Sequence, residues 1–300
     1  MNMTYSAFGL SWQLPFACPE MGVPKSYSAV DIRVSLGTVP EFLPEARDAG
    51  PFQQVTPNAV LFSFPGVARY LVQNGTEIII QPEPGAPETR LRLFLLGTAA
   101  ALLLHQRGIL PLHASGIRTP KGAVLFTGHS GFGKSTLLAT FLERGYDMLT
   151  DDVAAISLAE NGRPFVAPSY PHFKLWADSA EMLNKATNEL ERIRPELDKF
   201  AVPSAVALDD QPQPLHAIYV LTPTNDPELR LEMLQDARKF NVFLDHTWQK
   251  MALKRMNRHT EHFRQSVAIA NQVRLCRVYR PEKPFQPYAL ADLIEADFRA

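Results

Sequence analysis

The sequence predicts a mixed α/β (α+β) protein, and two observations carry this prediction. Between residues 27 and 88, short segments either alternate apolar and polar residues or run apolar for a few positions, with proline and glycine between them, which is typical of strands. Farther along, the apolar run at residues 123–126 leads into a glycine-rich loop and then into helical periodicity. We therefore expect a small β-rich N-terminal domain over residues 1–90 and an α/β domain over residues 91–300.

Composition and charge favour a globular protein that binds neither nucleic acid nor a membrane. The 300 residues are 46% hydrophobic, and 30 basic residues nearly balance 31 acidic ones, for a net charge of -1. Cys18 and Cys276 fit neither a zinc site nor a disulfide framework, so we expect two reduced thiols. Residues 1–20 do not resemble a secretory signal, and the apolar run at 93–104 is too short to span a bilayer. A cytoplasmic location is expected, and a homo-oligomer stays open.

Within the N-terminal region, strands are expected near residues 30–35, 60–64 and 77–81. The Asn74-Gly75 pair between two apolar segments predicts a hairpin. After a proline-rich linker, apolar residues at helical spacing predict a helix over residues 91–106, which Gly108 ends. Residues 109–117 are expected to form a strand or loop that precedes the strand at 123–126.

The segment from Gly128 to Ser135 matches the P-loop pattern G-x-x-x-x-G-K-[ST]. Its glycines let backbone N–H groups approach phosphate oxygens, and the following helix adds partial positive charge at its N-terminus. Lys134 would meet the β- and γ-phosphates of ATP, and the Ser135 hydroxyl would bind Mg²⁺. The residues expected to bind the nucleotide are Gly128, His129, Ser130, Gly131, Phe132, Gly133, Lys134, Ser135 and Thr136.

Two adjacent carboxylates, Asp151 and Asp152, interrupt a strand-like apolar run one helix after the P-loop. Burying both is costly unless cations meet them, and Mg²⁺ on a nucleotide would supply that charge. One of the pair could instead accept a proton near the γ-phosphate. The alternative is a solvated turn at a strand end, which the position after Lys134 disfavours.

Three runs taken together resemble the catalytic core of the HPr serine kinase family. They are His113-Ala-Ser-Gly, the P-loop, and Glu143-Arg-Gly-Tyr-Asp-Met-Leu-Thr-Asp-Asp, and their order and spacing agree over roughly residues 109–156. The resemblance implies a PEP-carboxykinase-like P-loop core that uses ATP and Mg²⁺ to phosphorylate a serine hydroxyl. It also implies catalytic roles for Lys134, Asp151, Asp152 and His113.

Within that resemblance, Asp151 is the candidate base and Asp152 a carboxylate at or near the metal, together with Ser135. Adjacent carboxylates titrate as a coupled pair, so either aspartate could be the base and the other the carboxylate near the metal. For His113, a hydrogen-bonded core histidine is the alternative to a neighbour of the aspartate pair.

The chain lacks the Glu-x-Arg-Gly-Leu-Gly signature that HPr kinase/phosphorylases carry downstream. In layout, and in the segments Phe62-Ser-Phe-Pro-Gly-Val-Ala-Arg-Tyr-Leu-Val and Tyr170-Pro-His-Phe-Lys-Leu-Trp176, it resembles instead the shorter HPr-kinase-like proteins associated with peptide natural products. These include the kinases that phosphorylate the C-terminal serine of lasso-peptide precursors. The predicted function is therefore an ATP- and Mg²⁺-dependent serine kinase acting on a peptide or small protein. An HPr-type kinase, a nucleotide-binding regulatory switch and a small-molecule kinase are the alternatives.

The remaining segments are predicted by pattern alone. Residues 170–176 are expected to form a loop that presents Lys174 and Trp176 to a ligand, although Trp176 could equally be core. Residues 180–197 are expected to form a surface helix, and residues 238–273 are expected to form a helical region. The basic side chains of the second region are either solvated or include an arginine, Arg255 or Arg258, that neutralises phosphate charge. Strands are expected at 215–221 and 273–279, and a last helix at 289–298.

Overall fold

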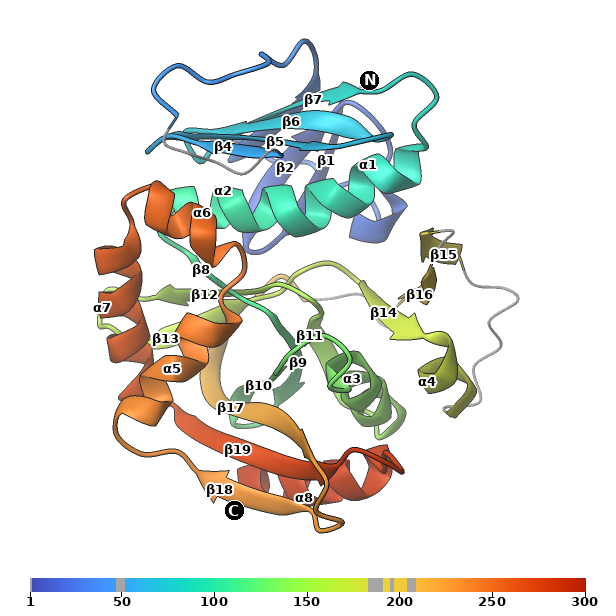
Figure 1. Ribbon diagram of the computed structural model, residues 1–300, viewed down its shortest axis with the longest axis vertical. Coiled ribbons are helices and arrows are strands. Elements are labelled where there is room, and N and C mark those ends of the chain that lie inside the picture. The colour runs from blue at the N-terminus through green and yellow to red at the C-terminus, as the bar shows by residue number, and fades with distance from the viewer. Residues whose placement is uncertain (1, 47–51, 183–190, 195–196, 204–208) are drawn as a thin grey trace.

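The computed structural model describes residues 2–46, 52–182, 191–194, 197–203 and 209–300, and it has the mixed α/β architecture that the sequence predicts (Figure 1). A sheet from the N-terminal third lies at one end of the molecule. A long helix runs beneath it, and the larger sheet with its helices lies on the other side of that helix. None of the helices in the described ranges is long and apolar enough to cross a membrane.

The N-terminal sheet has seven strands in the order β1-β2-β3-β7-β6-β5-β4. The predicted hairpin is confirmed: two strands pair in antiparallel register from Ala68↔Pro82 to Gln73↔Glu77, and Asn74 and Gly75 take the positive φ of the turn. The strands at either edge were not predicted, because they are short and lack a turn signal of that strength. The seven strands are β1 (Met3–Ala7), β2 (Leu10–Leu14), β3 (Ile32–Leu36), β4 (Gln53–Val55), β5 (Ala59–Phe64), β6 (Ala68–Gln73) and β7 (Glu77–Pro82), with a short 3₁₀ turn at Pro19–Met21.

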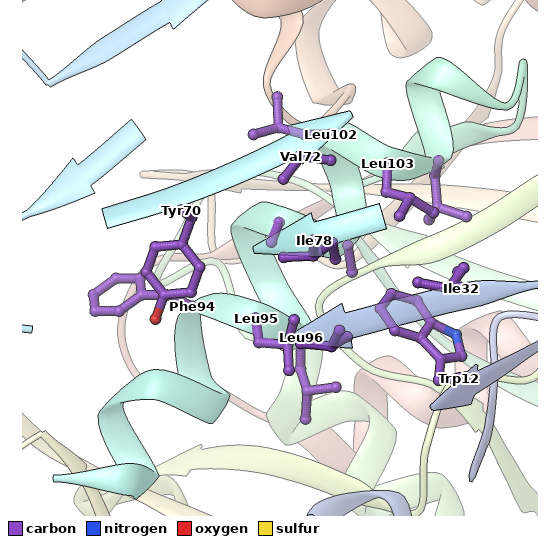
Figure 2. Packing of buried hydrophobic residues seen from close by; sticks show 14 of the residues in the cluster. Trp12, Ile32, Tyr70, Val72, Ile78, Phe94, Leu95, Leu96, Leu102 and Leu103 are labelled. Carbon is purple, nitrogen blue, oxygen red and sulfur yellow. The ribbon is translucent and has the colours of Figure 1, made fainter. Parts of the chain in front are cut away.

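The predicted helix over residues 91–106 is confirmed as a continuous helix from 88 to 106. It consists of α1 (Glu88–Phe94), a π-helical turn η2 (Leu95–Ala99) and α2 (Ala100–Gln106). Its apolar side packs on the N-terminal sheet, because strands of that sheet present alternate apolar residues toward it. Figure 2 shows this packing, in which the sheet contributes Trp12, Ile32, Tyr70, Val72 and Ile78, and the helix contributes Phe94, Leu95, Leu96, Leu102 and Leu103.

The second sheet has nine strands, and three of them, β10, β17 and β19, are parallel neighbours. Helices α3 and α8 pack on one face of these strands, and α5 and α7 pack on the other, because successive strand residues alternate between the faces. The strands are β8 (Leu110–Leu112), β9 (Ala114–Thr119), β10 (Gly122–Thr127), β11 (Asp147–Thr150), β12 (Ala154–Leu158), β13 (Pro164–Ala167), β17 (Gln213–Thr224), β18 (Arg230–Met233) and β19 (Arg274–Pro281), and the helices are α3 (Lys134–Glu143), α5 (Ala237–His246), α6 (Lys250–Arg255), α7 (His259–Ala270) and α8 (Pro287–Arg299).

This arrangement places the carboxyl ends of β10, β17 and β19 at one edge of the sheet, where α3 begins. Loops that follow these three strands therefore meet at the P-loop, which is where ligands bind in sheets of this kind. The predicted strands at 215–221 and 273–279 and the predicted last helix correspond to β17, β19 and α8. The predicted helical region at 238–273 corresponds to α5, α6 and α7. The predicted division of the chain between residues 90 and 91 stays a prediction.

The helix predicted over residues 180–197 is wrong where the structure describes it beyond Met182. After α4 (Ala177–Met182), the chain forms β15 (Glu191–Arg194) and β16 (Leu197–Pro203), and β16 pairs with β14 (His172–Trp176) in a separate three-stranded sheet. Pairing with β14 also makes residues 172–176 a strand rather than the predicted loop. Residues 183–190 and 195–196 of the predicted helix lie outside the described residues.

Replacing Leu103 with Ala tests the packing between the helix and the N-terminal sheet. The side chain is fully buried in the core shown in Figure 2, so we expect Leu103→Ala to lower the free energy of unfolding by about 2–5 kcal/mol. Leu244→Ala is the matched control, because Leu244 also lies in a helix but is 46% exposed, and it should cost about 0.5 kcal/mol or less. Urea denaturation measures both, and equal losses would contradict the packing.

Candidate functional site

The loop between β10 and α3 has the backbone conformation that the P-loop pattern requires. Gly128, Gly131 and Gly133 have φ values of 146°, 84° and 90°, which side chains rarely tolerate. Two of these glycines are also packed closely: a Cβ at Gly128 would lie 2.9 Å from the carbonyl oxygen of Leu221, and one at Gly133 would lie 2.7 Å from the ring of Phe285. The glycines therefore permit both the turn and the approach of neighbouring segments.

Lys134, the first residue of α3, lies over the loop that it follows. Its ammonium donates hydrogen bonds to the carbonyl oxygens of Gly128 at 2.9 Å and His129 at 3.1 Å. Burial lowers the pKa of Lys134 to about 8, although the charges of Asp152 and Asp151 pull the pKa upward. The charged form of Lys134 is therefore disfavoured by burial, and a phosphate anion bound next to it would stabilise that charge.

Asp151 joins the P-loop helix to two other segments. Its Oδ1 accepts hydrogen bonds from the hydroxyls of Ser115, at 2.6 Å, and Ser135, at 3.1 Å. Its Oδ2 accepts one from the backbone N–H of Lys174 at 2.9 Å. The carboxylate is only 2% exposed, and these three donors offset the cost of burying it.

The backbone at Asp152 turns sharply, so the two aspartates project toward different partners. Asp152 has a φ of 74°, and the N–H of Val153 donates to the carbonyl oxygen of Asp151 at 2.9 Å, which is the rare γ-turn with positive φ at its centre. A strained conformation of this kind persists only where the surroundings enforce it, and it is frequent at functional sites.

The Asp152 carboxylate is held by two side chains. Lys174 Nζ donates to Oδ2 at 2.6 Å, and His113 Nδ1 lies 3.3 Å from Oδ1 and donates to the Asp152 carbonyl oxygen at 3.0 Å. Burial would raise the pKa of Asp152, but the charge of Lys174, with a smaller contribution from His113, keeps that pKa far below its usual range. Asp152 is therefore ionised at neutral pH. Burial also lowers the pKa of His113, which favours the neutral ring.

Trp248, between α5 and α6, completes this part of the site. Its indole N–H donates to the carbonyl oxygen of Asp152 at 2.6 Å, and its ring lies edge-on to His113 with the centroids 4.8 Å apart. The backbone N–H of His113 donates to the carbonyl oxygen of His246 at 2.7 Å, which anchors the strand edge to α5. His113 is thus a hydrogen-bonded, largely buried histidine that also contacts the aspartate pair.

A cavity of about 810 Å³ opens over the P-loop, and we call it the P-loop cavity. Gly128 and His129 form the base of the loop and do not line the cavity. The predicted residues that line it are His113, Ser130, Gly131, Phe132, Gly133, Lys134, Ser135, Thr136, Asp151 and Asp152. The cavity is also lined by Leu93, Phe94, Gly97, Thr98, Lys174, Trp176, Pro223, Trp248, Arg280 and Phe285.

The sequence did not indicate Ser115, Trp248 or Arg280 as site residues. The arginine that it predicted to meet phosphate was Arg255 or Arg258. Arg280 is the penultimate residue of β19, packs over the ring of Phe285 at 4.4 Å and donates from Nε to the carbonyl oxygen of Phe132 at 3.3 Å. The available signal was its place near the carboxyl end of β19, which belongs to the same group of parallel strands as the P-loop strand β10. Arg255 and Arg258 do not line the cavity, and Arg258 pairs with Glu261 at 2.9 Å.

The residues beside the P-loop include oxygen ligands of the kind that Mg²⁺ prefers. The Ser135 hydroxyl and the Asp151 carboxylate oxygen lie 3.1 Å apart, and Mg²⁺ prefers oxygen ligands. In the part of the chain that the structure describes, no group of three or more His, Cys, Asp or Glu side chains is arranged to hold a metal. Mg²⁺ bound through few protein oxygens together with nucleotide phosphates is compatible with that arrangement.

Comparisons with known proteins find similarity among solved structures alone. No protein-family model matches the sequence, and no curated protein matches it. Among solved structures, the HPr(Ser) kinase/phosphatase from Coxiella burnetii is similar, at 14% sequence identity and a TM-score of 0.30, over 62% of this chain and 89% of that one.

The buried charge of Lys134 has a measurable cost. Because its pKa is about 8 in the folded chain and 10.5 ordinarily, the folded chain binds fewer protons between those values, so stability rises with pH over that window and the cost is fully present below pH 8. Lys134→Met keeps similar bulk without the charge, so it should be more stable than the native chain at pH 7, by up to about 3 kcal/mol.

Denaturant unfolding at pH 7 and at pH 10 measures this difference. The advantage of the variant should shrink as the pH rises above 8, because the native lysine then loses its charge in the folded state too. A variant that is less stable than the native chain at pH 7 would show that the hydrogen bonds of Lys134 outweigh its desolvation.

Proposed function

We propose that this chain is an ATP- and Mg²⁺-dependent serine kinase, which transfers the γ-phosphate of ATP to a serine hydroxyl of a peptide or small protein. The observation that carries the proposal is that one cavity combines a P-loop lysine with two aspartates whose surroundings differ. Asp151 faces the P-loop through Ser135, and Asp152 faces His113 and Lys174. Phosphoryl transfer needs positioning and charge neutralisation more than covalent chemistry, and these residues supply both.

On the P-loop side, backbone N–H groups of the loop and the N-terminus of α3 would hold the phosphates. Lys134 would leave the carbonyl oxygens it now binds and donate to phosphate oxygens, which would restore its full charge. Ser135 and Asp151 would hold Mg²⁺, which when bound neutralises phosphate charge and orients the γ-phosphate. This assignment moves the metal side from Asp152 to Asp151, because only Asp151 contacts Ser135.

On the other side, Asp152 would accept the proton of the serine hydroxyl. The serine oxygen forms a bond to the γ-phosphorus, the bond between that phosphorus and the β–γ bridging oxygen breaks, and ADP leaves. Asp152 is ionised and is fixed by Lys174, while Trp248 and His113 hold its backbone carbonyl. Lys174 could also neutralise charge on the transferred group.

The acceptor that best fits the resemblance in layout is the C-terminal serine of a lasso-peptide precursor. HPr is the second acceptor to test, because the three motif runs resemble its kinase. A regulatory switch would need the P-loop but no acceptor residues, and the Asp152–His113–Lys174 group supports transfer over a switch.

The test is incubation of the purified chain with γ-labelled ATP, Mg²⁺ and a panel of acceptors that includes HPr and peptides ending in serine. Label on a peptide serine supports the proposal, and label on HPr alone would support the HPr-type alternative. Tight nucleotide binding without label on any acceptor would contradict kinase activity and favour the switch.

The two aspartates should respond differently to substitution. Asp152→Asn should lower kcat by about 10²–10⁴-fold and leave the Kd of Mg-ATP nearly unchanged, since it removes the proton acceptor. Asp151→Asn should weaken binding of Mg-ATP more than binding of metal-free ATP, because it removes a ligand on the metal side. Nucleotide binding by titration calorimetry and initial rates with labelled ATP measure both, and the reverse pattern would exchange the two roles.

A further inference from the structure

The P-loop cavity has a wall that comes from the N-terminal part of the chain. Leu93 and Phe94 of α1 and Gly97 and Thr98 of the π-helical turn line it, together with the P-loop and the aspartates. A π-helical turn inside an α-helix is rare and occurs often at functional sites. Nothing in the P-loop chemistry uses this wall.

Gly97 keeps part of this wall empty. It is buried, yet a Cβ built on it would meet no heavy atom of the described residues within 4 Å, apart from its two chain neighbours and the nearby backbone of its own helix. Its backbone does not need glycine, because it is helical and its φ is not positive. Glycine within a helix costs roughly 1 kcal/mol relative to alanine, so the empty volume at this position is retained against helix stability.

The helix that carries this wall lies on the acceptor side of the cavity. At one end of the helix, His105 Nε2 donates to the carbonyl oxygen of Trp248 at 2.7 Å, and Trp248 in turn binds the Asp152 carbonyl. At the other end, Leu93 lines a second, smaller cavity together with Lys174, the ion-pair partner of Asp152. Gly97 and Thr98 lie between these two ends.

Residues on the other side of the P-loop belong to different elements. Pro223 lies in β17, Arg280 lies near the end of β19, and Phe285 follows β19 and packs against Gly133. These residues are positioned by the parallel strands next to the phosphate loop. A ligand that approaches Asp152 would therefore contact the helix at 88–106 instead of these residues.

We propose that Leu93, Phe94, Gly97 and Thr98 form a subsite for the residue next to the acceptor serine, and that this subsite selects an apolar neighbour. Gly97 provides the room, Leu93 and Phe94 provide apolar contact, and the Thr98 hydroxyl hydrogen-bonds the acceptor backbone. The inference rests on the proposed function, because it takes Asp152 as the group that faces the serine. The occupant is a peptide, because a subsite beside the serine requires a residue joined to it, which for a C-terminal serine is the residue that precedes it.

The first experiment fills the empty volume. The full chain with Gly97→Leu is compared with the native chain and with Ala296→Leu, which adds similar bulk at an exposed position of α8 away from the cavity. The probes are single-serine peptides that differ only in the neighbouring residue, leucine or aspartate. The native chain should prefer the leucine peptide, and Gly97→Leu should raise its KM about tenfold or more while the Kd of Mg-ATP stays within about twofold.

A second variant pair tests the hydroxyl. Thr98→Val keeps the shape and removes the hydrogen bond, so it should raise peptide KM for both peptides about equally, and Thr98→Ser should restore the native value. A change in thermal stability without a change in KM would indicate a merely structural role for Thr98 and would overturn this part of the proposal.

Binding separates this subsite from the proposed function. Fluorescently labelled forms of the same peptides are titrated into each variant in the presence of a non-hydrolysable ATP analogue, so no transfer is required. Weaker binding of the leucine peptide by Gly97→Leu, with Ala296→Leu unchanged, supports the subsite even if no label is transferred in the kinase assay. Unchanged peptide binding, equal binding of the two peptides by the native chain, or an equal loss of nucleotide affinity overturns it.

Discussion

The burial of two adjacent carboxylates is the constraint on which the site depends. Asp151 and Asp152 directly follow β11 and are largely removed from solvent, and burying carboxylates without partners is costly. The partners come from the P-loop helix, from the strand that begins with Ala114, from β14, and from Trp248 after α5. Each of these segments is therefore fixed relative to the others through one pair of residues, and the P-loop cavity takes its shape from that arrangement.

The sequence predicted well what is local in the chain. The P-loop, the aspartate pair and the hairpin at Asn74 depend on residues within a few positions of each other, so motif and periodicity were sufficient. Lys174 binds Asp151 and Asp152 across separations of 23 and 22 residues, and Trp248 binds Asp152 across 96. Contacts over such distances depend on tertiary packing that a periodicity cannot encode. The wrong helix over residues 180–197 has the same origin, because pairing with β14 decides the structure of β16.

Several features of the site lower the stability of the fold without improving its packing or hydrogen bonding. Lys134 is a buried charge with a lowered pKa, Asp152 has an unfavourable backbone conformation, and Gly97 weakens a helix. All three lie around one cavity, whereas the rest of the large sheet has continuous apolar packing on both faces. Concentration of such costs is expected where side chains and space are kept for a ligand.

The N-terminal sheet takes part in this site through the helix at 88–106. One continuous core contains residues of that sheet, of the helix and of the segments that flank the aspartates, including Val153 and Tyr170. The helix is therefore not a hinge between two separate cores; it is packed on both sides, with His105 bound to the backbone of Trp248. The described residues of this sheet do not line the P-loop cavity, but the sheet supports the helix wall that the proposed acceptor would meet. Under the proposed function, acceptor specificity and phosphate binding would reside on different walls of one cavity, so acceptor preference could change through the N-terminal wall without altering the phosphate loop.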